Sequence, residues 1–180
     1  LQKRSRPKTC KTLGPTDLFF LASSKIKSIL FSCAIPTAAV SSLMNDEPVW
    51  FGCDVSKHFH RDLGVMDIDL FDYDSFYDIN FGMNKAARLE YGDSQMTHAM
   101  LFTGVDLNSN NEPIKWRVEN SWGTKGGEKG YNIMSDKWFD EYNYEVVIHK
   151  SHLPEKLVDL FQNKDAIHLD PWDPMGALAF

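Results

Sequence analysis

The sequence predicts an α+β fold of antiparallel strands with helical excursions, and three observations point to it. Thr97 to Val105 is apolar apart from one histidine and two threonines, and it has the length of a buried strand. Lys115 to Asn120 alternates, so that Trp116, Val118 and Asn120 face one side. The turn-forming residues 106–113 lie between them. These features indicate two antiparallel strands joined by a hairpin-like connection.

The elements before this hairpin follow from spacing. Helical spacing of Ile26, Ile29, Leu30 and Cys33 predicts a helix over Asp17 to Ala34, and a helix closes over Ala38 to Asn45. Pro48 to Val55 is a predicted strand with its odd-numbered residues on one face. Leu63 to Phe81 is aromatic and acidic and is expected to be a long excursion packed on the strands.

The later elements have clear boundary signals. Asn84 to Glu90 is a predicted helix, with Asn84 as N-cap and Gly92 just past its end. The remaining predictions are strands over Tyr131 to Met134 and Tyr144 to Ile148, a helical turn capped by Ser135, a helix over Glu155 to Gln162, and an extended arm over Ile167 to Phe180.

Charge divides the chain near residue 37. Residues 1–37 carry seven Lys or Arg and one acidic residue, a net charge of +6, whereas the rest carries 12 basic and 24 acidic residues, a net charge of −12. We expect 1–37 to be a separate basic segment, helical or disordered. Its cluster Lys3 to Lys11 could neutralise nucleic-acid phosphates, but the pattern favours a frayed, solvated terminus. No apolar run reaches membrane-spanning length, so no membrane association is expected.

The cysteines and histidines favour neither a disulfide framework nor a metal centre. Three cysteines, Cys10, Cys33 and Cys53, lack framework spacing, which favours a reducing compartment. We expect Cys53, within a strand, to be a small buried residue. His58 and His60 form a His-x-His pair without further ligands at a convincing spacing, so neither a metal nor a cofactor is expected.

His98 and Asn120 are the candidate catalytic pair. If the two strands pair about residue 109, these side chains lie opposite one another on the same face, within a shift of a residue or two. An amide oxygen that accepts the imidazole N–H fixes the tautomer and aims the other ring nitrogen. A thiol nucleophile needs no more than a neutral amide as the orienting group.

Several motifs resemble a known family. Asn120-Ser121-Trp122-Gly123 resembles the asparagine motif of papain-like cysteine proteases. The runs 96–100, 116–120 and 172–179 are very similar to the bleomycin hydrolases, and the likeness spans roughly 38–180, the C-terminal part of such proteins. The resemblance implies the β-barrel-like right-hand half of the papain-like fold, with an insertion at 63–81.

The resemblance also implies an activity. Members are cytoplasmic cysteine aminopeptidases that act on peptide substrates and form homo-hexameric rings. His98 would be the base, Asn120 its orienting group and Trp122 a shield for their hydrogen bond. The C-terminal arm would enter the cleft, and after removal of Phe180 the carboxylate of Ala179 would hold the substrate amino group.

The nucleophile does not fit the resemblance. The flanks of Cys10 and Cys33 do not match the glycine-rich motif around the family's catalytic cysteine. We therefore expect the chain to supply the His/Asn half of an aminopeptidase site and to be inactive alone. Two alternatives stay open: an inactive fragment that associates with full-length subunits, and a translated intron over 1–37, which sequencing the transcript across residues 30–45 would decide.

Overall fold

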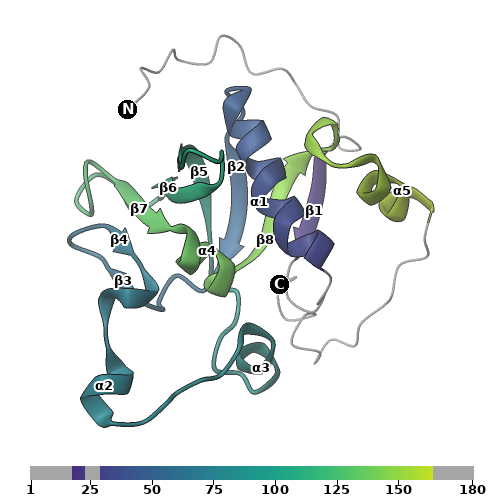
Figure 1. Cartoon of the computed structure of the whole chain (residues 1–180). Helices are drawn as coiled ribbons and strands as arrows, with labels where there is room; N and C mark the ends of the chain where they lie inside the picture. The colour runs from purple at the N-terminus through teal and green to yellow at the C-terminus, as the bar shows by residue number, and fades with distance from the viewer. Residues whose placement is uncertain (1–17, 23–28, 164–180) are drawn as a thin grey trace.

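A computed structural model describes residues 18–22 and 29–163 of the 180-residue chain. Its centre is an eight-stranded sheet with the order β1-β8-β2-β5-β6-β7-β4-β3 (Figure 1). The strands are β1 (Leu18–Ala22), β2 (Val49–Cys53), β3 (Phe59–His60), β4 (Val65–Met66), β5 (His98–Leu107), β6 (Pro113–Glu119), β7 (Tyr131–Ser135) and β8 (Asn143–His149). The predicted α+β fold is confirmed, but the sheet stays open, since β1 and β3 form its two edges.

Helices cover one face of this sheet and extend from its ends. The α-helices are α1 (Ile29–Met44), α2 (Tyr73–Tyr77), α3 (Lys85–Glu90), α4 (Asp136–Tyr142) and α5 (Glu155–Asn163), and two short 3₁₀ turns are η1 (Ile68–Leu70) and η2 (Lys150–His152). Helix α1 crosses the sheet over β2 and β8, and α3 lies beyond the end of the sheet (Figure 1). No helix in the described part of the chain is long and apolar enough to cross a bilayer.

The core lies between the covered sheet face and helices α1 and α4. Strands contribute Phe51, Phe102, Trp116 and Val118, while Trp138 comes from α4, and each of these side chains is almost fully buried. The rings of Phe51 and Phe102 stack with centroids 3.8 Å apart. Burial of these large apolar side chains is the main contribution to the stability of this fold.

The central hairpin forms as predicted, with a shifted register. Strands β5 and β6 are antiparallel, and Leu101 faces Glu119, whereas the sequence-based register placed it opposite residue 117. A bulge between Phe102 and Gly104 changes the register once more. Because pairing with β6 starts at Leu101, the first residues of β5 are held by β2 alone, where His98 faces Cys53.

The helix predicted over Asp17 to Ala34 is wrong in its first part. Residues 18–22 form strand β1, which pairs with β8, rather than part of a helix, and the helix begins at Ile29. The run Leu18–Ala22 is apolar throughout, so periodicity could not distinguish strand from helix. The excursion 63–81 also contains strand β4, which pairs parallel to β7, together with η1 and α2. Helix α1 runs continuously across position 37, the point at which the charge pattern divides the chain.

Candidate active site

The structure brings His98 and Asn120 together at one end of the sheet. His98 is the first residue of β5, and Asn120 directly follows β6. Both carry the parity of the buried residues Met100 and Val118, so they share the face of the sheet that α1 and α4 cover. The imidazole Nε2 lies 2.9 Å from the Asn120 Oδ1.

Hydrogen bonding around the amide defines the tautomer of the imidazole. Asn120 Oδ1 also accepts the Ser121 backbone N–H at 2.8 Å, so the oxygen faces two donors and the amide orientation is fixed. An oxygen can only accept, so Nε2 of His98 must carry the hydrogen. In the neutral ring, Nδ1 then holds the free electron pair. The Asn120 Nδ2 is buried without a hydrogen-bond partner among the described residues.

Trp122 packs against the imidazole from the loop that follows β6. The two ring centroids lie 4.9 Å apart, and the guanidinium of Arg61 lies 5.1 Å from the centre of the Trp122 ring on the β3–β4 connection side. Trp122 is 48% exposed, so it covers the pair on one side only. In the shielding role proposed for Trp122, this apolar cover would lower the local dielectric and strengthen the His98–Asn120 hydrogen bond. The contact of Arg61 with Trp122 arises from the fold, and no sequence pattern predicted it.

Cys53, the one cysteine whose side chain the structure describes, is unsuited to nucleophilic attack. Cys53 faces His98 in the β2–β5 ladder, but its side chain is fully buried, as predicted. Burial, and to a lesser degree the neighbouring Asp54, raise the pKa of its thiol well above the usual value. A thiol of this kind stays protonated and inert. Cys10 and the side chain of Cys33 lie outside the described residues.

The two histidines of the His-x-His pair do not form a ligand set. The described part of the chain contains no group of three or more His, Cys, Asp or Glu side chains that could hold a metal. The His58 ring lies among aromatic rings, 5.8 Å from that of Tyr142. Burial, followed by the charges of Lys57 and Arg88, lowers the pKa of His58.

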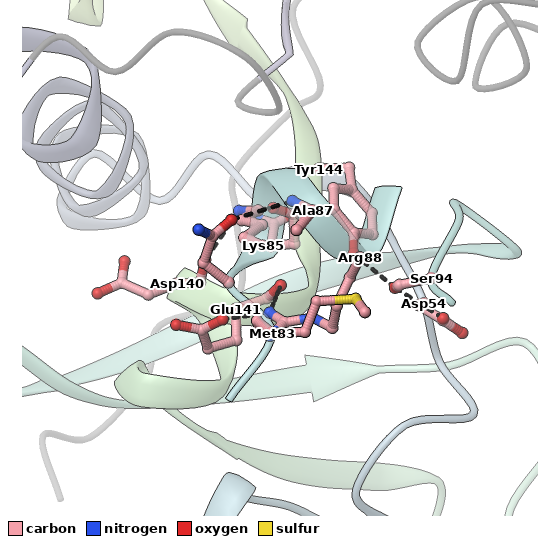
Figure 2. Close-up of polar contacts among 11 residues, drawn as sticks. Asp54, Met83, Lys85, Ala87, Arg88, Ser94, Asp140, Glu141 and Tyr144 are labelled. Carbon is pink, nitrogen blue, oxygen red and sulfur yellow. Dashed lines mark hydrogen bonds and ion pairs between the residues drawn. The ribbon is translucent and has the colours of Figure 1, made fainter. Parts of the chain in front are cut away.

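A polar network docks α3 against α4 and the start of β8, and the sequence did not predict it. Figure 2 shows Lys85 and Arg88 of α3 directed toward α4 and the start of β8. Lys85 Nζ donates to the backbone oxygens of Asp140 at 2.8 Å and Asn143 at 2.6 Å, and Arg88 forms an ion pair with Glu141. Burial is the main cause that lowers the pKa of Lys85 to about 8. This docking fixes the segment that leads into β5.

The comparisons with known proteins agree with this architecture. The fold is the β-rich half of the papain-like cysteine peptidases, with an open sheet. The Peptidase C1-like family model matches residues 32–176, and the chain therefore belongs to the Peptidase C1-like family.

Individual relatives show the same likeness. The chain is 50% identical to bleomycin hydrolase of Mus musculus over 142 residues, which is 77% of this chain and 31% of that protein. It is 48% identical to aminopeptidase C of Lactococcus lactis subsp. lactis over 141 residues, 78% of this chain and 32% of that protein. The crystal structure of PepW from Lactobacillus rhamnosis matches with a TM-score of 0.75 and 50% identity, over 78% of this chain and 32% of that one. The chain thus spans about a third of the length of these relatives.

Proposed function

We propose that this chain supplies the His/Asn half of a cysteine-type aminopeptidase site of the bleomycin hydrolase type, which hydrolyses N-terminal peptide bonds and related amides. The observation that carries the proposal is the hydrogen bond from His98 Nε2 to Asn120 Oδ1, because it leaves Nδ1 as a base of fixed direction. The family membership supports the same reading.

In the proposed reaction, His98 moves protons and Asn120 orients it. Nδ1 takes the proton of a cysteine thiol, and the thiolate attacks the carbonyl carbon of the substrate. The C–N bond then breaks, and the amine leaves with the proton from Nδ1, which produces a thioester. Water, deprotonated by the same nitrogen, attacks the thioester, and the C–S bond breaks to release the acid and regenerate the thiol. The His98–Asn120 bond stabilises the imidazolium between these steps.

The remaining parts of the site are proposed from the family. The nucleophilic cysteine would come from sequence outside the described residues, since the Cys53 thiol is buried. Ala179, also outside the described residues, would hold the substrate amino group through its carboxylate. Assembly as a hexamer and a cytoplasmic location belong to the same proposal.

A chimera tests the proposal. Residues 32–176 replace the matching third of the Lactococcus lactis aminopeptidase C, whose first two thirds would then supply the other half of the fold. We expect the chimera to hydrolyse aminoacyl-coumarin amides, and we expect His98→Ala to abolish turnover. The isolated 180-residue chain should have no activity. A correctly assembled chimera without turnover would contradict the proposal, and turnover by the isolated chain would identify Cys10 or Cys33 as the nucleophile.

A second candidate is an inactive chain that associates with full-length subunits. The burial of the Cys53 thiol favours it. Mixing the tagged chain with an intact relative tests this candidate. Co-purification and a loss of the relative's activity would support it, and a monomer that ignores the relative would exclude it.

A further inference from the structure

We propose that Asp54, together with the hydroxyl groups of Ser94, Thr97 and Tyr144, positions His98 by clamping the start of strand β5. These four residues form the β5 clamp. The inference rests on the proposed function for its catalytic meaning. Its geometry stands independently, because it concerns how one strand end is held.

The start of β5 needs an anchor other than the sheet. Pairing between β5 and β6 begins at Leu101, so His98 and the two residues after it pair only with β2. Strand β2 itself ends at Cys53, the residue that faces His98. A strand end held on one side frays readily, and fraying here would move the imidazole away from Asn120.

The clamp begins at the point where this ladder ends. Asp54 is 3% exposed, and its backbone N–H donates to the Tyr142 carbonyl oxygen at 3.1 Å. Its Oδ2 accepts the hydroxyl of Ser94 at 2.9 Å, and its Oδ1 accepts that of Thr97 at a long 3.4 Å. A buried carboxylate surrounded by hydroxyl donors, rather than by a basic side chain, acts as a rigid acceptor for the segments that bear those hydroxyls.

The hydroxyl groups form an ordered hydrogen-bond chain from Tyr144 in β8 to Asp54, the residue directly after β2. The Ser94 hydroxyl is used in the bond to Asp54, so its oxygen accepts from Tyr144 at 2.5 Å (Figure 2). Ser94 is 2% exposed, and its backbone N–H donates to the Arg88 carbonyl oxygen at 3.1 Å. The clamp therefore links the docked helix α3 to the strand that carries His98. Burial raises the pKa of Tyr144 to about 12, so this donor keeps its proton over the physiological range.

Thr97 completes the clamp next to the imidazole. Its backbone N–H donates to the Cys53 carbonyl oxygen at 3.0 Å, and its Oγ1 accepts the Val55 N–H at 3.3 Å. Three contacts thus fix the residue directly before His98. Displacement of a catalytic group by about 1 Å can lower a rate about a hundredfold, so a small loss of order here matters for catalysis.

The exchange rate of the His98 ring N–H reports how often the start of β5 opens locally, which differs from the overall stability of the chain. In the 180-residue chain, ¹⁵N-labelled histidine with His98→Gln as the assignment standard identifies the Nε2–H that bonds Asn120. We expect Ser94→Ala to speed its exchange about tenfold, because the opening of the strand end becomes more frequent. Thr97→Val should act in the same direction, and Thr97→Ser, which keeps the hydroxyl, should restore slow exchange.

Ser42→Ala is the matched control. Ser42 is 3% exposed and donates its hydroxyl to the Glu47 carbonyl oxygen, at the far end of α1. Ser42→Ala should lower the thermal midpoint as Ser94→Ala does and leave the His98 exchange rate unchanged. The proposal is overturned if both serine variants affect His98 equally, if neither does, or if the wild-type ring shows no protected Nε2–H. Failure of the proposed function would instead appear as an inactive chimera with this exchange pattern intact.

Discussion

Lys85 gives a pH dependence of stability whose sign and size follow from its environment. Its pKa is about 8 in the folded chain against the ordinary 10.5, mainly through burial, with Asp140 and Glu141 opposing the shift and Arg88 adding to it. Between these two pH values, the unfolded chain binds a proton that the folded chain has released. The free energy of unfolding therefore rises with pH, and Lys85 contributes roughly 2 kcal/mol between pH 8 and pH 10.

The Lys85→Met variant isolates this contribution. Methionine has a similar shape and no charge, so the rise attributed to Lys85 should be absent. Other ionisable groups, such as the Cys53 thiol with its raised pKa, act in both proteins and cancel in the difference. Urea unfolding at pH 7, 8, 9 and 10, followed by fluorescence of the buried Trp116 and Trp138, measures both curves. Equal slopes for the two proteins, or a wild-type curve that falls relative to the variant, would refute the reasoning.

Two further substitutions test the fold around the site. Gly127→Ala should destabilise the chain by about 2 kcal/mol or more relative to Gly92→Ala. Both glycines have positive φ, but their surroundings differ. A Cβ at Gly127 would lie 2.2 Å from the Tyr131 carbonyl oxygen, whereas Gly92 faces open space. Similar thermal midpoints would contradict this. Trp138→Phe should cost about 1–3 kcal/mol in urea unfolding, because the indole N–H that donates to the Lys57 carbonyl oxygen at 2.8 Å is lost; an unchanged midpoint would show that water replaces it.

Local patterns predicted most strands and helices, and long-range packing explains the rest. The strand expected over Tyr144 to Ile148 lies within β8, and the helix expected over Asn84 to Glu90 is α3 with Asn84 as its N-cap. Strand β1 was missed because an apolar run of five residues fits either structure, and β4 because its parallel partner β7 is distant in sequence.

The site was predicted unevenly for a similar reason. His98 and Asn120 flank a recognisable turn, so antiparallel pairing alone brought them near each other in the prediction. The register between β5 and β6 differs from the predicted one by two residues because of the turn length and a bulge. Neither feature follows from a simple sequence pattern. Asp54 and Lys85 carry charges that normally indicate exposed positions, and only the tertiary fold buries Asp54 and half-buries Lys85.

A double-mutant cycle in the chimera tests whether Asn120 acts through His98. We predict that Asn120→Ala lowers kcat by about 10- to 100-fold, since it removes the group that orients the base. His98→Ala should cost much more, and the double variant should be no slower than His98→Ala alone, because residues that act as one unit are not additive. Additive losses in the double variant would contradict the central claim that these two side chains form one catalytic pair.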